Sequence, residues 1–415
     1  MEALPHETEL IATVAVGLSA AFVGGLIVHR LRLPTLIGYL LAGVALGPFT
    51  PGFVADTHLA PQLAEIGVIL LMFGVGNHFS IGDLLAVRRI ALPGAIGQVA
   101  IATSLGFALT RIWGWDIGAG LVFGLALSVA STVVLLRALE ARGQLTAEPG
   151  RVAVGWLVVE DLIMVLVLVL LPAVAPSIGR IDQSAGALDS TSLLNTLLIT
   201  FIKVAIFVAL MLVGGVRLIP WLLRRVEATG SRELFVLAVL AMALGIAYGA
   251  AELFGVSFAL GAFLAGVVVN ESELSHRAAE EAMPLREAFA VLFFVSVGML
   301  IDPAFLVAEV GRIVLVVAIV MLGKALAALL LVRVLGGTTE TGLVVAAGLS
   351  QIGEFSFILA SMGMALDLLP PEGNNLILAG ALVSITLNPL LFAAVRPLHD
   401  RMTLRSRLTP QTSDG

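Results

Sequence analysis

The chain has 415 residues, of which 59% are hydrophobic and 13% charged, and its mean hydropathy is +1.07. This composition excludes a soluble globule and predicts an all-α polytopic membrane protein. The net charge of −6 decides little, because in a membrane protein the position of charges matters more than their sum. The lack of cysteine excludes disulfides and thiolate metal sites, and no basic patch with aromatic residues points to nucleic acid.

Thirteen apolar segments, each expected to cross the membrane as a helix, follow one another along the chain. They are 10–28, 35–50, 62–79, 90–110, 117–139, 152–171, 193–216, 233–253, 256–270, 286–301, 313–332, 341–363 and 374–396. We expect residues 1–400 to form the membrane domain and 401–415 a short cytoplasmic tail, with no nucleotide-binding domain present.

The arginines alternate between the two ends of these segments. Eighteen lie after odd-numbered segments or in the C-terminal tail, and only Arg111, Arg180 and Arg312 lie after even-numbered ones. By the positive-inside rule the N-terminus is outside and the C-terminus cytoplasmic, as expected in a bacterial-type inner (plasma) membrane.

The chain repeats itself at an offset of about 222 residues. Gly38–Val44 (GYLLAGV) returns as Gly261–Val267 (GAFLAGV), and Ile69–Gly76 (ILLMFGVG) returns as Val291–Gly298 (VLFFVSVG). The offset equals seven segments, an odd number, so the second copy is inverted in the membrane. The pattern predicts two inverted-topology repeats, helices 1–6 and 8–13, as in secondary transporters.

Two adjacent acids, Glu160 and Asp161, lie at the middle of segment 152–171. A charge at that depth costs at least ~2.5–3.5 kcal/mol on insertion scales, so the default interpretation is an ion or proton site. A carboxylate gives a monovalent cation both an oxygen ligand and a countercharge, and it can bind a proton instead. The alternative is a carboxylate that packs helices together or lies in a dimer interface.

Lys324 lies at the centre of segment 313–332, too far from either end to reach the interface easily. It needs an acidic partner, and Asp161 is the candidate; an ion pair broken by proton or cation binding would couple the two events. Alternatively, the lysine caps a carbonyl group or fixes a helix crossing.

Polar residues cluster at matching positions of segments 5 and 12. The clusters are Ser128, Ser131 and Thr132 in the first, and Ser350, Gln351, Gly353 and Glu354 in the second. Such residues suit helices that unwind in mid-membrane, because their side chains satisfy freed backbone groups. We therefore expect crossed, discontinuous helices 5 and 12 that present carbonyl groups to an ion, with Glu354 compensating a helix end or pairing with a lysine. Serines that only pack helices closely are the alternative.

Residues 270–286 (NESELSHRAAEEAMPLR) form an acidic polar stretch on the predicted cytoplasmic side. We expect this stretch to be helical, and it is either a solvated loop or a docking surface for a regulatory domain or subunit.

Four stretches resemble the Kef-like (potassium/proton) branch of the monovalent cation:proton antiporter superfamily. They are LVVEDLIMVL in segment 6, FFVSVGMLID (Phe293–Asp302), GLSQIGEFSFIL (Gly348–Leu359) and EIGVILLMFGVG (Glu65–Gly76). The resemblance implies a homodimer of thirteen-helix protomers, each with a dimerisation and a mobile core subdomain. It also implies that Asp161 carries the transported ions, that Lys324 is its basic partner, and that K⁺ and H⁺ are exchanged without a cofactor. Better-known Kef sequences place glutamine where this chain has Glu160, which leaves the stoichiometry open.

The sequence therefore predicts a secondary antiporter that exchanges a monovalent cation, K⁺ in preference, for protons. A Na⁺/H⁺ antiporter and a gated, channel-like K⁺ efflux pathway on the same fold are the alternatives. An enzyme is not expected, because the chain contains neither HExxH nor GxSxG.

Overall fold

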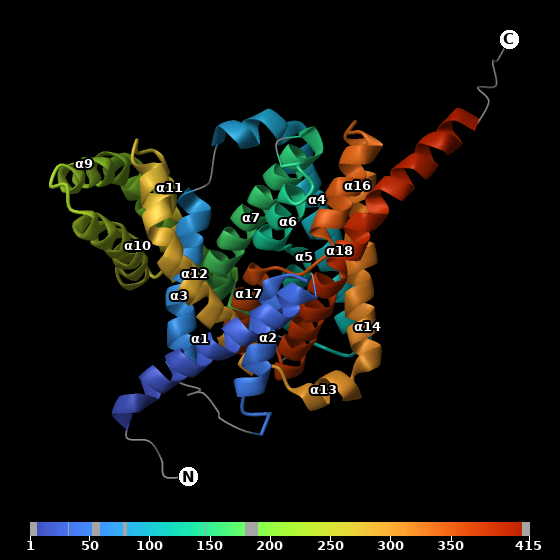
Figure 1. Ribbon diagram of the computed structural model, residues 1–415, viewed down its shortest axis with the longest axis horizontal. Coiled ribbons are helices and arrows are strands. Elements are labelled where there is room, and N and C mark those ends of the chain that lie inside the picture. Colours follow the sequence, from blue (N-terminus) through green and yellow to red (C-terminus); the bar gives the residue numbers. More distant parts are fainter. Residues whose placement is uncertain are drawn as a thin grey trace. The chain divides into compact units, whose positions relative to one another are not determined.

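The computed structural model describes residues 6–31, 33–51, 59–77, 81–145, 147–178 and 190–408, and every regular element within these ranges is a helix (Figure 1). Within the predicted tail, residues 401–408 continue the last helix, whereas 409–415 lie outside the described residues, as do Arg32 and Arg180. The prediction of an all-α chain is confirmed.

Nine helical stretches in the described ranges are long and apolar enough to cross a membrane. They fall in α1 (His6–Arg30), α3 (Leu59–Asn77), α4 (Ile81–Ile112), α7 (Glu148–Ile178), the run of α8 (Ser190–Leu210), η1 (Met211–Gly215) and α9 (Val216–Glu227), α10 (Arg232–Phe254), α12 (Ser275–Met299), the run of α14 (Val310–Ala318), η2 (Ile319–Gly323) and α15 (Lys324–Val334), and α18 (Pro371–Leu408).

The remaining apolar elements are shorter or broken. The pair α16 (Thr339–Leu349) and α17 (Glu354–Ala365) would span together and is bent by 44° at its break. Three helices are apolar but short, namely α2 (Thr35–Leu46), α5 (Ile117–Ser128), which is followed by α6 (Thr132–Glu140), and α11 (Phe258–Asn270). Each of the thirteen predicted segments coincides with one of these stretches. The chain is a polytopic membrane protein; that all thirteen segments cross the membrane stays a prediction.

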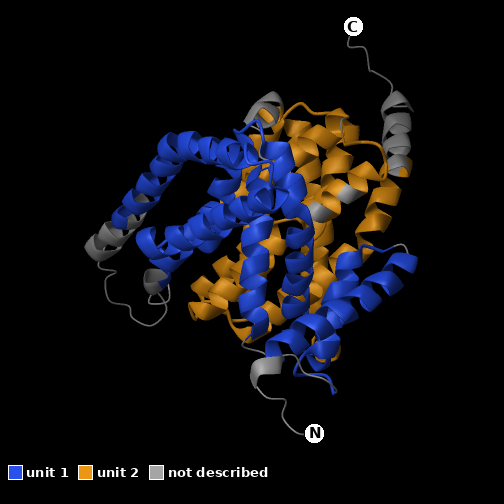
Figure 2. Ribbon diagram, turned by 60° about the vertical axis from the view of Figure 1, so that its left-hand side comes forward, with its two compact units in different colours: residues 1–80, 165–305 blue, residues 81–164, 306–415 orange. Residues whose placement is uncertain are grey.

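The chain divides into two compact units, each built from two separate stretches of sequence (Figure 2). Unit 1 comprises residues 1–80 and 165–305, and unit 2 comprises residues 81–164 and 306–415. Two of the three boundaries fall inside α7 and inside the short helix α13 (Pro303–Ala308), and the third lies at the start of α4. Each unit thus draws helices from both halves of the sequence.

Helices of unit 1 pack through glycines at very close range. A Cβ atom on Gly43 in α2 would lie 2.1 Å from the carbonyl oxygen of Val295 in α12, and one on Gly76 in α3 would lie 2.0 Å from that of Phe263 in α11. No real side chain tolerates such distances, so these backbones touch directly. Small residues at helix interfaces are a common means of association in membranes, where helices gain little from the hydrophobic effect.

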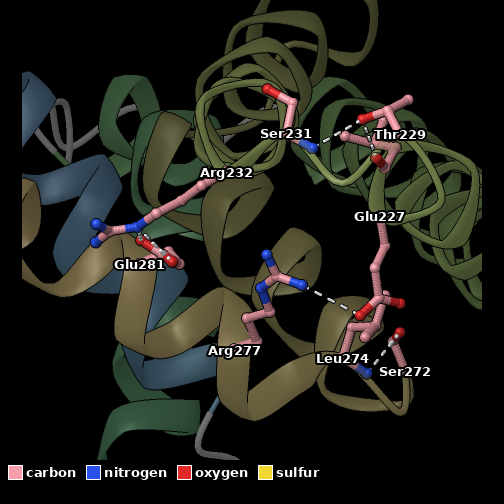
Figure 3. Close-up of polar contacts among 9 residues, drawn as sticks. Glu227, Thr229, Ser231, Arg232, Ser272, Leu274, Arg277 and Glu281 are labelled. Carbon is pink, nitrogen blue, oxygen red and sulfur yellow. Dashed lines mark hydrogen bonds and ion pairs between the residues drawn. The ribbon is translucent and has the colours of Figure 1, made fainter.

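The predicted polar stretch 270–286 becomes mostly helical. After α11 the chain turns, and α12 begins at Ser275, eleven residues before the predicted start of the tenth segment. Ion pairs hold this end of unit 1 together: Arg232 Nε lies 2.8 Å from Glu281, and Arg277 lies 3.2 Å from Glu227 (Figure 3). The stretch is therefore no simple loop, and part of its charge is used inside the unit.

Candidate ion-binding site

Two helix breaks meet within unit 2, as the sequence predicted. The first separates α5 from α6, and the second separates α16 from α17. The backbone N–H of Gly353 in the second break donates to the carbonyl oxygen of Val129 in the first at 3.2 Å. A Cβ atom at position 353 would lie 2.4 Å from the carbonyl oxygen of Ala130, so only glycine permits this approach.

Gln351 joins the two breaks with its side chain. Its Oε1 accepts from the backbone N–H of Ser131 at 3.0 Å, while its Nε2 donates to the carbonyl oxygen of the same residue at 3.0 Å. Nε2 also lies 3.3 Å from the carbonyl oxygen of Gly348. Gln351 is fully buried. Its amide thus replaces backbone hydrogen-bond partners that the residues at both breaks lose where the helices unwind.

The C-terminal end of α5 is completed by side chains from other helices. Gln98 in α4 donates from Nε2 to the carbonyl oxygen of Ser128 at 3.1 Å, and Ser356 in α17 donates to that of Ala126 at 2.6 Å. Neither Gln98 nor Ser356 was predicted from the sequence. The available signal was polarity within apolar stretches: Gln98 stands between apolar residues, and Ser356 follows Glu354 by two residues.

The break after α16 is supported from α18 in the same way. Asn388 donates from Nδ2 to the carbonyl oxygen of Ala347 at 2.7 Å, and the hydroxyl of Ser384 accepts from the backbone N–H of Ile352 at 3.3 Å. Both side chains are buried and were also missed from sequence. Freed backbone groups at both breaks are thus satisfied by fixed side chains.

Asp161 is 3% exposed and is only partly satisfied by the protein. Its Oδ2 accepts from the hydroxyl of Thr132, at the start of α6, at 3.0 Å. Its Oδ1 is buried and, among the described residues, has no hydrogen-bond partner. The charges that act on it most are those of Glu354 and Glu160.

The two other acids also keep one oxygen unpaired. Glu160 is fully buried and accepts from the backbone N–H of Ala130 at 3.0 Å through Oε2. Glu354, in the first turn of α17, lies within reach of the Ser131 hydroxyl. Glu160 Oε1 and Glu354 Oε2 are buried with no hydrogen-bond partner in the described part of the chain. Buried unpaired carboxylate oxygens are rare, so three around one pair of helix breaks indicate a functional site.

Lys324 does not reach Asp161. Its side chain is fully buried, and Nζ donates to the backbone carbonyl oxygen of Gln351 at 3.1 Å. The acid whose charge acts on it is Glu160. Within the described chain no ion pair joins Lys324 to Asp161, so the partnership that we expected from sequence is not formed in this structure.

The reason lies in how α7 and α15 are turned. Depth in the membrane is similar for both acids, but adjacent residues of a helix point about 100° apart, so a lysine from one neighbouring helix faces one of them. Lys324 also directly follows the π-helical turn η2. Its backbone N–H donates to the carbonyl oxygen of Ile319 at the start of that turn. Such turns change the facing of the residues after them and recur at functional sites.

Three hydroxyl groups were predicted at the site, and one of them, that of Thr132, forms a hydrogen bond with Asp161. The Ser128 hydroxyl donates to the carbonyl oxygen of Leu125 at 2.7 Å, one turn back in its own helix. The Ser131 hydroxyl accepts from the backbone N–H of Val134 at 3.3 Å and so caps α6. Thr132 alone directs its hydroxyl to Asp161.

The half-helix ends and the charges complement one another. The N-terminal ends of α6 and α17 carry partial positive charge and lie next to carboxylates, whereas the C-terminal end of α16 lies next to the ammonium of Lys324. The C-terminal end of α5 receives neutral donors, namely the amide of Gln98 and the hydroxyl of Ser356. In the described ranges no three His, Asp or Glu side chains converge as ligands of one metal ion.

Residues 17–395, most of the chain, match the family described as "Sodium/hydrogen exchanger, transmembrane". The chain belongs to the sodium/hydrogen exchanger family. A member of this family is a transporter and not an enzyme, so the prediction that the chain is no enzyme is confirmed.

Relatives of the chain carry transport names. The chain is 60% identical over 388 residues to the Escherichia coli (strain K12) protein YbaL, whose name assigns it provisionally to the cation/proton antiporters; the match covers 94% of this chain and 69% of YbaL. It is 32% identical to K(+) efflux antiporter 4 of Arabidopsis thaliana, over 99% of this chain and 68% of that one. These relatives confirm the predicted family and the assignment as a cation/proton antiporter.

A solved structure shares the fold. The sodium proton antiporter MjNhaP1 from Methanocaldococcus jannaschii, at pH 8, aligns with a TM-score of 0.65 over 94% of this chain and 99% of that one. Sequence identity between the two is 17%, so this likeness shows the antiporter fold alone.

Proposed function

We propose that this family member exchanges K⁺ for protons by alternating access, with Asp161 binding the two in competition. One observation carries the proposal: Asp161 is buried where two broken helices meet, and one of its oxygens has no partner among the described residues. A dehydrated monovalent cation needs an oxygen ligand and a countercharge, and this carboxylate offers both. A bound proton neutralises the carboxylate, so the two Asp161 oxygens bind either the cation or the proton and not both at once.

Neighbouring groups have distinct parts in this scheme. Thr132 would hold the Asp161 carboxylate in place and could share an oxygen with the cation, while Ser131 and Ser128 supply backbone oxygens beside it. Gln351 would keep the two breaks together. Glu354 adds negative charge near Asp161, and this charge favours the binding of a positive ion there.

Glu160 and Lys324 determine the stoichiometry in this proposal. If Glu160 stays ionised beside Lys324, only Asp161 exchanges its proton, and one cation replaces one proton without net charge movement. If Glu160 also takes up and releases a proton, more than one proton moves per cation and the exchange is electrogenic.

The mechanical arrangement that we propose follows the repeats. Thirteen helices, in two inverted repeats with the N-terminus outside and the C-terminus cytoplasmic, would form a homodimer in an inner membrane. Unit 1 would supply the dimerisation part and unit 2 the mobile core, because the buried charges lie in unit 2. A regulatory domain or subunit at residues 270–286 also stays a prediction.

The preference for K⁺ rests on the Kef-like stretches and on the name of the Arabidopsis relative. Sodium is the second candidate, since the matching solved structure is titled a sodium proton antiporter. A third, channel-like pathway would use the same fold without the exchange cycle.

Purified protein in liposomes containing a pH-sensitive dye tests the proposal, with K⁺, Na⁺, Li⁺ and Rb⁺ offered separately. We expect K⁺ to drive the largest proton movement, and we expect valinomycin to accelerate it only if exchange is electrogenic. Absence of proton movement with all four cations would exclude the proposal. Single-protein rates far above ~10⁴ ions per second, too fast for a μs–ms rigid-body cycle, would favour a channel.

A further inference from the structure

Trp156 lies one helical turn before Glu160 on α7, in unit 2. Residues four apart on a helix lie on the same face, one above the other. The Trp156 side chain is fully buried, within the same hydrophobic cluster as Ala130 and Ala328. That cluster includes residues from the first helix break and from the helix that carries Lys324.

A buried donor and a buried acceptor lie one helical turn apart here without forming a hydrogen bond. The indole Nε1–H of Trp156 has no acceptor and Glu160 Oε1 has no donor, counting only the described residues. The indole N–H nevertheless lies close enough to interact with the Glu160 carboxylate. Leaving either group unpaired in an apolar interior is unfavourable, so a small movement that joins them would satisfy both.

The position of the indole is fixed by a glycine on the neighbouring helix α4. A Cβ atom on Gly94 would lie 2.2 Å from Cζ3 and 2.3 Å from Cη2 of Trp156. The six-membered ring therefore occupies the space that any side chain at position 94 would need. This contact limits how far the ring can move towards α4.

Glu160 needs a partner that does not depend on Lys324. Its Oε2 is held by the backbone N–H of Ala130, and Lys324 is the only cation whose charge acts on it in the described chain. A transported cation at the adjacent Asp161 would repel the ammonium of Lys324, and the third acid near the breaks, Glu354, supplies no positive charge in its place. Glu160 would then be left as a buried charge with one donor.

We propose that Trp156 is a positioning residue whose indole N–H takes up Glu160 Oε1 when the cation at Asp161 displaces Lys324. This role rests on the proposed exchange at Asp161 and gives Glu160 a neutral donor in addition to the charge of Lys324, whose Nζ itself bonds the carbonyl oxygen of Gln351. In the proton-loaded state Lys324 neutralises Glu160, and in the cation-loaded state Trp156 keeps the carboxylate ionised and in place.

The variant Trp156→Phe keeps an aromatic ring and removes the N–H. We expect its maximum exchange rate in liposomes to fall about tenfold, because hydrogen bonds to charged groups are worth about 1.4 kcal/mol or more and that energy corresponds to a factor of ten. The KM for the cation should change little, because Trp156 does not touch it, whereas the dependence of the rate on pH should move relative to the wild type.

Two further variants separate this role from packing. Gly94→Ala keeps the N–H but pushes the indole away, so we expect the same displaced pH dependence. Phe392→Leu removes a ring from the same hydrophobic cluster, in α18, and should leave the pH dependence as in the wild type. Melting temperatures of all three report folding.

If Trp156→Phe has the same rate and pH dependence as the wild type, the proposed role of Trp156 is wrong. Exchange by the wild-type protein would still support the proposed function in that case. An equal displacement in Phe392→Leu would also overturn it, because packing alone would then explain the effect. If Trp156→Phe does not fold, Gly94→Ala decides between the outcomes. Absence of exchange in the wild type would instead remove the proposed function.

Discussion

Both units bring helix backbones close together through glycines, but they differ in the polar groups that they bury. Unit 1 brings backbones into direct contact through glycines such as Gly43 and Gly76, and its buried polar side chains in the described ranges are neutral. Unit 2 breaks two helices and surrounds the breaks with charge. All buried charged side chains of the described chain lie in unit 2, namely Glu160, Asp161, Lys324 and Glu354. Unit 1 is therefore suited to rigid packing. Unit 2 buries three acids and one lysine, so a bound cation can balance its excess of acidic groups.

Removal of Lys324 should have the largest effect on stability. Lys324→Ala leaves Glu160 buried without a countercharge, and breaking a buried pair costs about 3–5 kcal/mol. Thermal unfolding in detergent should show a marked fall in the melting temperature, and the pH dependence of exchange should change. The double variant Lys324→Ala with Glu160→Gln should recover much of the stability; if it is no more stable than Lys324→Ala, the two charges are not coupled.

A methyl group on Gly43 tests the rigid contact of unit 1. Gly43→Ala forces α2 away from α12, and overpacking of this kind typically costs about 1–3 kcal/mol. We expect a lower melting temperature but an unchanged exchange rate per folded molecule. The matched control is Gly245→Ala in α10, where no atom lies within 4 Å of the added group and stability should not fall.

The same change in unit 2 sharpens the contrast. Gly353→Ala meets the carbonyl oxygen of Ala130 and pushes the two breaks apart, at a comparable cost in stability. Here we expect exchange per folded molecule to fall as well, because the site itself is displaced. Equal behaviour of Gly43→Ala and Gly353→Ala in the liposome assay would contradict the division of roles between the units.

The smallest effect is expected at the exposed ion pairs of unit 1. Arg232→Gln removes a pair whose arginine side chain is 78% exposed, and water and salt screen such pairs strongly. The melting temperature and the exchange rate should both match the wild type at physiological salt. A large loss of stability would show that this cluster holds α10 and α12 together more strongly than its exposure indicates.

Much of this arrangement could be predicted from the sequence. The lengths of the apolar segments located the helices. Polar clusters inside two of these segments located both breaks, because polar residues in a membrane interior are tolerated where they form hydrogen bonds with freed backbone groups. Asp161 was found because no packing requirement explains an acid at that depth.

The partner of Lys324 could not be predicted. It depends on how α15 is turned relative to α7, and the π-helical turn η2 just before Lys324 changes that orientation without any clear signal in the residues. Gln98, Asn388 and Ser384 are the opposite case: their polarity was visible, but which carbonyl or N–H group each one would reach depends on tertiary contacts.

The exchange rate of Asp161→Asn in liposomes tests the central claim most directly. Asparagine has the shape of aspartate but neither its charge nor its titratable proton. Asp116→Asn is the matched control, since Asp116 caps α5 through the backbone N–H of Ala119 and asparagine caps equally well. We expect Asp161→Asn to fold and to exchange no cation for protons, and Asp116→Asn to exchange as the wild type does. Full exchange by Asp161→Asn would contradict the account.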